Sequence, residues 1–273
     1  MKISVYTGHV YMADFNSVEE GFSHMYNQGV RTGDIIDSEF NSVPFLMYND
    51  ILNNAGLKVN SIVSLADITS VDKNECTKNM AIVRGYLEHM EKRNIPFLMM
   101  APRVKPATND DEFYGMRERM IESYSMLIEY SRGSGVTICI ENQSSLLRPD
   151  SEMQNIRYIL DNVPELKFTL DTGNFYCIGE DFLEGYELLK DRIIHAHVKD
   201  WREEKYGKNV TFDGIFYSGC ALGEGMMPLD EICRRMTNDG FDIPLTIEIN
   251  SYITQRRLDA SVEFLKKNLS VSY

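Results

Sequence analysis

Eight short apolar runs, most of them separated by longer amphipathic stretches, constrain the fold more than any other feature of the sequence. The runs are KISVYTG, GDIIDSEF, LKVNSIVSL, IPFLMMAP, GVTICIE, LKFTLD, IIHAHVKD and IPLTIEIN. Apolar residues recur with helical i, i+3, i+4 spacing in several of the stretches between them. Examples are residues 71–93, 111–132, 151–162, 229–239 and 251–267.

Eight strands alternating with helices in 273 residues fit a (β/α)8 barrel, which typically takes about 250 residues. We therefore predict an α/β fold with a single TIM-barrel domain over residues 1–273. A doubly wound sheet is the alternative. It usually has fewer strands and often a glycine-rich first turn, and no G-x-G-x-x-G opens a helix here.

The charge and the cysteines indicate where such a chain works. The net charge of -13 argues against a nucleic-acid partner, because such binding depends on basic contacts to phosphate. It also fits poorly with an anionic membrane surface. Five scattered cysteines without a C-x-x-C indicate reduced thiols, and no apolar run resembles a signal peptide or a membrane span. We expect a cytoplasmic protein with a small-molecule partner, no nucleic-acid or membrane partner, and compatibility with a homo-oligomer.

The last four predicted strands share one pattern. Side chains alternate between the two faces of a strand, and in TICIE, KFTLD, IIHAHVK and LTIEIN one face is apolar. The other face ends in an ionisable group in each strand: Glu141, Asp171, His197 and Glu248. The apolar face suits contact with outer helices, so we expect the ionisable groups inside the barrel, at the strand ends where barrel enzymes build their sites.

A lone histidine or glutamate at a strand end is more often a core or capping residue, but four consecutive strands are harder to explain in that way. Three carboxylates that converge at low dielectric repel one another, and a bound cation removes that repulsion. Three oxygen donors and one nitrogen suit one divalent ion such as Mn²⁺, Mg²⁺ or Co²⁺, and are also compatible with Zn²⁺. The pattern therefore predicts a metal site.

The segments ICIEN, LDTGN, HAHVKD, ALGEG and LTIEIN, in this order and spacing, resemble the xylose-isomerase-like TIM-barrel superfamily. This group of sugar isomerases and epimerases includes ketose 3-epimerases and endonuclease IV. The resemblance covers essentially the whole chain and is sharpest from Glu141 to Asn250. It implies that Glu141, Asp171, His197 and Glu248 hold the metal, the same four residues that strand alternation selects. It also implies that Glu141 and Glu248 are the catalytic acid and base.

Further residues near these strand ends are candidates for substrate contacts. His195 shares the face of His197 one layer deeper, which favours a partner of the ligand or a core histidine. Lys199 is placed for a substrate hydroxyl or carboxylate, although a solvated lysine is an equal alternative. We also predict substrate contacts for Asn174 and Arg202. The long segment from residue 201 to residue 227, which holds the only tryptophan, is expected to be either a lid or a structural loop.

The resemblance also separates members of the superfamily. Endonuclease IV has additional histidine ligands on its third and fourth strands, another three residues after the aspartate, and a D-x-H after its seventh strand. The corresponding positions of this chain hold Ser64, Leu65, Ala101, Pro102, Asn174 and Ile215. A trinuclear cluster cannot be assembled from these residues, which disfavours an endonuclease that acts at abasic sites.

The sequence thus predicts a metal-dependent isomerase that moves a proton through an enediolate of a ketone-bearing sugar, sugar phosphate or polyol. Return of the proton to the opposite face is epimerisation, and its return to the neighbouring carbon is aldose–ketose isomerisation. Elimination of a β-hydroxyl would make the same site an inosose-type dehydratase. A non-catalytic sugar-binding barrel is a further alternative, disfavoured because both glutamates are present. The sugar, its phosphorylation and the native metal stay open.

Overall fold

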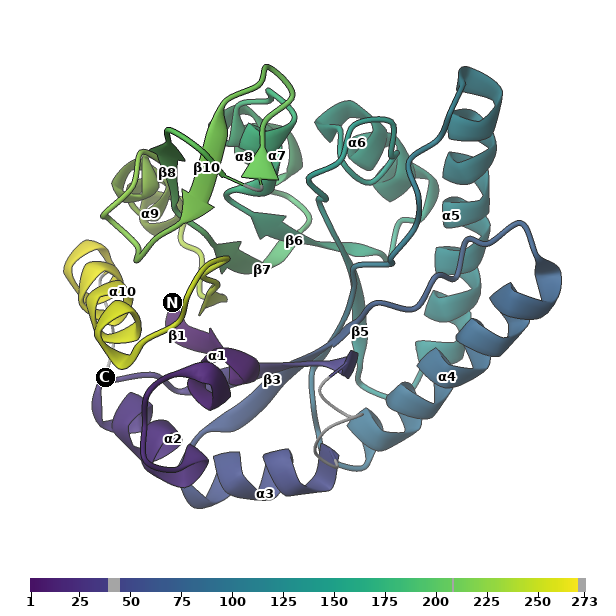
Figure 1. The fold of residues 1–273 in the computed structure, drawn as a ribbon. Helices are drawn as coiled ribbons and strands as arrows, with labels where there is room; N and C mark the ends of the chain where they lie inside the picture. Colours follow the sequence, from purple (N-terminus) through teal and green to yellow (C-terminus); the bar gives the residue numbers. More distant parts are fainter. Residues whose placement is uncertain (39–44, 208, 270–273) are drawn as a thin grey trace. The chain divides into compact units, whose positions relative to one another are not determined.

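The computed structural model describes residues 1–38, 45–207 and 209–269. Eight parallel strands form a closed barrel in the order β1-β11-β7-β6-β5-β4-β3-β2, with helices between them along the chain (Figure 1). The strands are β1 (Lys2–Tyr6), β2 (Thr32–Ile36), β3 (Lys58–Ser64), β4 (Phe97–Met100), β5 (Thr137–Glu141), β6 (Lys167–Asp171), β7 (Ile193–Val198) and β11 (Pro244–Ile247). The predicted (β/α)8 class is confirmed. Each apolar run matches one barrel strand, and β2 begins one residue before its run. Glu39 and Phe40, at the end of the second run, lie outside the described residues.

The helices that the spacing predicted are also present, with ends shifted by a few residues. The helices are α1 (Thr7–Met12), α2 (Val18–Asn27), α3 (Phe45–Asn54), α4 (Lys73–Glu91), α5 (Asp110–Ser131), α6 (Met153–Asn162), α7 (Asn174–Cys177), α8 (Phe182–Leu189), α9 (Leu229–Asn238) and α10 (Gln255–Asn268). In the part of the chain that the structure describes, no helix combines the length and the apolar character that a membrane crossing requires.

The chain packs as two compact units. The first comprises Met1–Asn60, Asp171–Gly173 and His195–Tyr273, and the second comprises Ser61–Leu170 and Asn174–Ile194. The organisation as a single domain stays a prediction.

In the first unit, β1 lies between β2 and β11, and β11 pairs with β7. Ser4 lies beside Thr246, and Thr246 lies beside His197, so one row of side chains crosses three strands. The alternate positions of β1 and β11, such as Val5 and Ile247, are fully buried apolar residues. This register sets the polar side chains of neighbouring strands at matching heights, which is what a site built from several strands requires.

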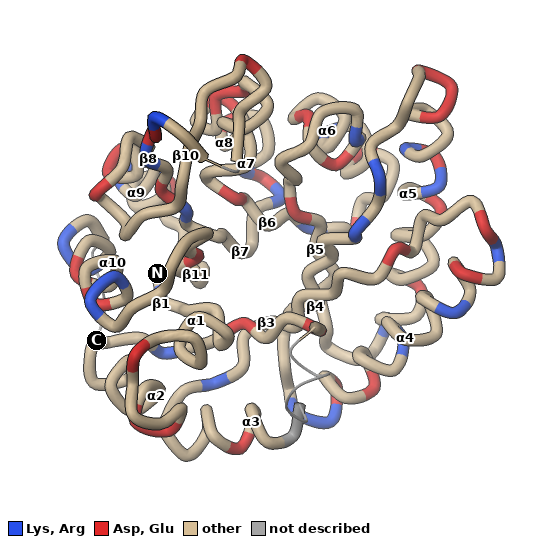
Figure 2. The backbone as a smooth tube through the Cα atoms, in the orientation of Figure 1, with Lys and Arg blue, Asp and Glu red and all other residues tan. Residues whose placement is uncertain are grey.

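In the second unit, β4 pairs with β3 and with β5, and α4 and α5 run along the outside of these strands (Figure 1). The buried residues of α4 are Met80, Val83, Leu87 and Met90, which recur at helical spacing. Side chains cap both helices: the carboxylate of Asp72 accepts from the first turn of α4, and the amide oxygen of Asn109 accepts from that of α5. Both signs of charge are interspersed along α5, and the same holds for α10 in the other unit (Figure 2).

The segment from residue 201 to residue 227 contains a small antiparallel sheet of β8 (Trp201–Glu204), β10 (Phe216–Gly219) and β9 (Asn209–Val210). Its base is anchored at two points. Trp201 is buried and donates from Nε1 to the carbonyl of Gly173 over 2.8 Å. The Asp200 carboxylate accepts from the backbone amides of Gly223, Gly225 and Met227. The loop base is therefore a structural element, while Tyr206 and Phe212 farther along it are exposed.

Two helical glycines of the second unit give a matched test of packing. Gly85→Ala in α4 should raise the free energy of unfolding by about 0.5–1 kcal/mol, because no atom lies within 4 Å of the new Cβ. Gly185→Ala in α8 should lower it by about 1–3 kcal/mol, because the Cβ would lie 2.6 Å from the buried ring of Phe175. Urea unfolding of both variants measures the difference, and changes of the same sign would contradict this packing of α8.

Candidate metal centre

Three of the four predicted ligands lie together in the first unit. Asp171 ends β6, His197 lies near the end of β7, and Glu248 directly follows β11. Each offers a ligand atom within 4.8 Å of those of the others. Nδ1 of His197 lies 3.2 Å from Oε2 of Glu248. The ends of these strands thus bring two carboxylates and one imidazole to one place.

Hydrogen bonds from backbone amides hold these ligands at or next to the ends of their strands. The amide of Glu248 donates to the carbonyl of Val198, which extends the pairing of β11 with β7 by one step. The amide of Thr172 donates to the carbonyl of His197. Oδ1 of Asp171 accepts from the amide of Gly173 over 2.9 Å, which orients that carboxylate. Neighbouring strands therefore fix the positions of all three groups.

Lys199 contacts the same two carboxylates. Its Nζ lies 2.6 Å from Oδ2 of Asp171 and 2.9 Å from Oε1 of Glu248, and the side chain is buried. Burial alone would raise the pKa of Glu248, but the Lys199 ammonium and the His197 imidazole outweigh burial and lower the pKa to about 2. The sequence was also compatible with a solvated lysine at this strand end. That alternative is wrong, because the side chain is buried and paired with two carboxylates.

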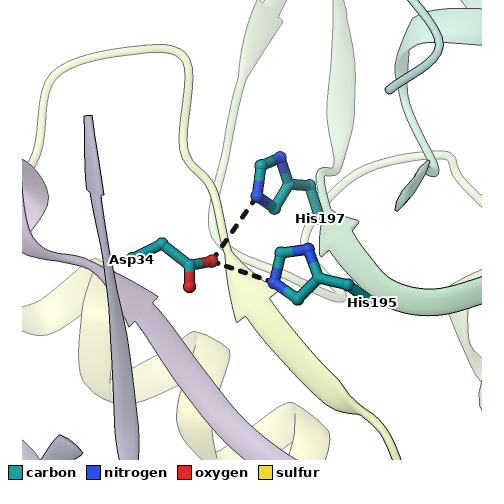
Figure 3. A group of neighbouring side chains, drawn as sticks. All are labelled: Asp34, His195 and His197. Carbon is teal, nitrogen blue, oxygen red and sulfur yellow. Dashed lines mark hydrogen bonds and ion pairs between the residues drawn. The ribbon is translucent and has the colours of Figure 1, made fainter. Parts of the chain in front are cut away.

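A second cluster lies around Asp34 on β2. Nε2 of His195 lies 3.0 Å from Oδ2 of Asp34, and Nε2 of His197 lies 3.5 Å from the same oxygen (Figure 3). Nε2 of His195 also lies 3.0 Å from Oγ1 of Thr246. Thr246 also donates to Oδ2, and Asn60 donates to Oδ1 over 3.2 Å. His195 thus occupies the deeper layer that strand alternation predicted, as a buried partner beside His197.

The hydrogen bonds account for the Asp34 cluster without an ion, although Asp34, His195 and His197 have ligand atoms close enough to hold one. Burial alone would raise the pKa of Asp34, but the ion pairs and hydrogen bonds from His195 and His197 outweigh burial and hold the pKa well below its usual range. The carboxylate accepts from several donors at once, which is the condition under which a buried charge is tolerated. We therefore interpret this cluster as a support for His197.

Sequence reasoning missed three residues around His197: Tyr6, His9 and Asp34. The hydroxyl of Tyr6 lies 3.4 Å from Nδ1 of His197, and Nε2 of His9 accepts from the amide of Ile249 over 2.8 Å. The acid inside the apolar strand GDII was a visible signal for Asp34. No periodicity marked His9, because α1 follows β1 directly and has only six residues.

Glu141 and Asn174 belong to the second unit. Glu141 ends β5, is buried, and its Oε2 accepts from Nε2 of Gln143 over 3.2 Å. Nδ2 of Asn174 donates to the carbonyl of Asn142 over 2.8 Å, so Asn174 lies beside the residue that follows Glu141. The membership of Glu141 in the ligand set stays a prediction, as does the predicted role of Asn174.

Arg202, the remaining predicted substrate contact, points toward solvent. It lies on β8, its side chain is 48% exposed, and its Nη2 lies 3.4 Å from Oε2 of Glu224. A substrate contact by Arg202 stays a prediction. Asp200, which follows β7, caps the next segment, because its carboxylate accepts from the backbone amides of Gly223 and Met227.

The xylose isomerase-like TIM barrel family matches residues 11–268, and the chain belongs to this family. Among solved structures, an IOLI protein with a binding zinc atom superposes with a TM-score of 0.79 at 14% identity, covering 99% of this chain and 100% of that one. A D-psicose 3-epimerase with D-tagatose from Clostridium cellulolyticum H10 superposes with a TM-score of 0.76 at 15% identity, over 99% and 100% of the two chains. At these identities the likeness concerns the fold.

Relatives in sequence are distant and match over part of their length. An inosose dehydratase of Lacticaseibacillus casei is 25% identical over 154 residues, 53% of this chain and 49% of the relative. A fructoselysine 3-epimerase of Escherichia coli O157:H7 is 24% identical over 147 residues, 52% of this chain and 49% of the relative. The chain thus spans about half the length of the curated relatives that it matches.

The donor chemistry of the first unit fits a divalent ion. Asp171 and Glu248 offer carboxylate oxygens and His197 an imidazole nitrogen, which suits a hard or borderline cation. The oxygens Oδ2 of Asp171 and Oε1 of Glu248 already attract one cation, the ammonium of Lys199. The site is therefore built to hold positive charge.

His9 makes stability depend on pH. Burial lowers its pKa from 6.5 to about 4, so the unfolded chain takes up a proton first as the pH falls. The contribution of His9 is full above about pH 6.5 and is lost as the pH falls toward 4. Between pH 7 and pH 5.5, the wild type should lose about 1 kcal/mol more stability than His9→Gln, which does not titrate.

Urea unfolding at both pH values measures this difference. His89→Gln, at an exposed position of α4, is measured alongside as a control for the substitution itself. An identical pH dependence in wild type and His9→Gln would show that His9 is not held neutral by burial.

Proposed function

We propose that this chain is a divalent-metal-dependent isomerase or epimerase that acts on a sugar, a sugar phosphate or a related ketone-bearing polyol. The observation that carries the proposal is the convergence of Asp171, His197 and Glu248 at the ends of neighbouring parallel strands. Membership of the xylose isomerase-like family supports it, as does the similarity to a fructoselysine 3-epimerase. Mn²⁺, Mg²⁺ and Co²⁺ are the favoured ions, and Zn²⁺ is compatible.

We assign Glu141 as the fourth ligand and as one of the two acid–base groups. Strand register supports this assignment. Glu141 pairs with Thr169 of β6, and Asp171 follows Thr169 by two residues on the same strand. Residues two apart share a face of a strand. Glu141 is thus on the face of β5 that corresponds to the face of β6 carrying Asp171.

We propose the following roles for these residues. An ion held by these ligands would polarise a substrate carbonyl and so acidify the neighbouring C–H. One glutamate removes that proton, and the other returns a proton to the opposite face or to the adjacent carbon. Lys199 is placed to contact a substrate oxygen, and Tyr6 and Asp34 keep the imidazole of His197 in position.

A second candidate reaction uses the same residues. The inosose dehydratase relative favours elimination of water from a cyclitol ketone, in which the abstracted proton is followed by loss of a β-hydroxyl. A panel of ketoses and inososes, incubated in D₂O with the metal-loaded protein, distinguishes the two. Deuterium next to the carbonyl without loss of water indicates epimerisation or isomerisation, and a product that has lost one molecule of water indicates dehydration.

The cysteines support a proposal about where the protein acts. All five cysteines lie among the described residues, and none is disulfide-bonded. We propose a cytoplasmic enzyme of carbohydrate metabolism whose partner is a small molecule and not a nucleic acid or a membrane.

Metal stoichiometry tests the assignment of the histidine. Wild-type protein dialysed against Mn²⁺ should retain about one ion per chain, and His197→Ala should lose most of it because a ligand is removed. His195→Gln is the matched control: it keeps a donor for Asp34 and should retain the ion. Equal loss in both variants would mean that the wrong histidine has been assigned.

Glu248→Gln tests the role of the second glutamate. The change keeps the size and one oxygen donor but removes the basic carboxylate, so turnover should fall about 10²–10⁴-fold. Deuterium wash-in and product formation are followed side by side on metal-loaded protein. Glu187→Gln, which removes an exposed carboxylate paired with Lys190, is the control and should turn over normally. Normal turnover by metal-loaded Glu248→Gln would reduce Glu248 to a ligand.

A further inference from the structure

The ammonium of Lys199 occupies a defined place among the ligands of the first unit. It contacts one oxygen of each of the two carboxylates, Oδ2 of Asp171 and Oε1 of Glu248, at 2.6 and 2.9 Å. Both contacts are direct ion pairs, and all three side chains are largely buried. Lys199 thus bridges two groups that are predicted to bind a metal.

The other oxygens of these carboxylates have different partners. Oδ1 of Asp171 accepts from the amide of Gly173, and Oε2 of Glu248 lies 3.2 Å from Nδ1 of His197. Lys199 thus contacts one oxygen of each carboxylate, and a divalent ion that binds either of these oxygens would compete with the ammonium for it. Such an ion takes carboxylate oxygens at about 2.0–2.6 Å, and two cations that share the same oxygens repel each other strongly in a buried site.

The backbone of Lys199 is fixed, so only its side chain can leave. Oγ1 of Thr172 accepts from the Lys199 amide over 2.9 Å and donates to the Lys199 carbonyl over 3.0 Å. A Cβ on Gly173 would lie 2.9 Å from Cβ of Lys199 and 2.5 Å from Nε1 of Trp201, so the close packing at this point depends on glycine. The ammonium can swing about its own side-chain bonds, but it stays within one side-chain length of the carboxylates.

We propose that Lys199 is an internal counter-ion of the metal site: it neutralises Asp171 and Glu248 in the metal-free protein, and the incoming divalent ion displaces it. The displaced ammonium then remains beside the ion as the group that meets a substrate oxygen. This inference rests on the proposed function, because it requires that a metal binds here. It makes Lys199 both a stabiliser of the metal-free fold and a competitor that lowers metal affinity.

The test measures Mn²⁺ affinity by calorimetry for the wild type, Lys199→Met and Lys190→Met. Lys190→Met is the matched control, because it removes the same charge from an exposed pair with Glu187. Lys199→Met should bind Mn²⁺ at least about tenfold more tightly than the wild type, because no cation has to be displaced. Lys190→Met should bind like the wild type.

The temperature of thermal unfolding is a second measurement. It should change only if Lys199 neutralises the two carboxylates, and not if the lysine merely lies near the ion. In the presence of a chelator, Lys199→Met should unfold at a lower temperature than the wild type, because two buried carboxylates lose their counter-ion. Saturating Mn²⁺ should close that gap. If the variant is unfolded in chelator, recovery of its native circular dichroism on addition of Mn²⁺ is the equivalent result, and failure to recover overturns the proposal.

The outcomes distinguish failure of the counter-ion role from failure of the proposed function. Mn²⁺ bound by Lys199→Met with the affinity of the wild type, or more weakly, overturns the counter-ion role and leaves the proposed function intact. Equal thermal stability of the two proteins in chelator also overturns it. No Mn²⁺ bound by either protein overturns the proposed metal-dependent function, and the counter-ion proposal with it.

Discussion

Three carboxylates of one compact unit, those of Asp34, Asp171 and Glu248, lie largely out of contact with water. An uncompensated buried charge would destabilise the fold by several kcal/mol. The neighbouring strands supply the compensation: His195 pairs with Asp34, and Lys199 pairs with Asp171 and Glu248. The rest of the site depends on this balance of charge, because the same residues that neutralise the acids also set the orientation of the ligands.

The balance is made possible by the register of parallel strands. Thr246 lies beside Ser4 on one side and His197 on the other, so side chains from β1, β11 and β7 meet at one height. Inside the barrel, His195 and Asp34 form a deeper row of side chains. His197 lies nearer the ends of the strands (Figure 3). The fold tolerates extensive change of sequence, which agrees with a solved structure that superposes with a TM-score of 0.76 at 15% identity.

Sequence pattern was sufficient for the strands and for the convergence of Asp171, His197 and Glu248. Alternation along a strand and the common direction of parallel strands are local and regular, so they carry over from sequence to structure. The partners of these residues could not be predicted from the sequence in the same way. A solvated Lys199 was an equally good interpretation of the sequence. Its ion pairs are with Asp171 at the end of β6 and Glu248 after β11, and neither residue is close to it in sequence.

By itself, the sequence determined the (β/α)8 class, the approximate positions of the eight strands and the strand ends at which Asp171, His197 and Glu248 lie. Only the tertiary structure decided that Asp34 and His195 form a buried pair, that His9 accepts from the backbone beside Glu248, and that Lys199 bridges two predicted ligands. The physical reason is the range of the interactions. Periodicity is a property of consecutive residues, whereas the neutralisation of a buried charge depends on which distant strands lie next to one another and in what register.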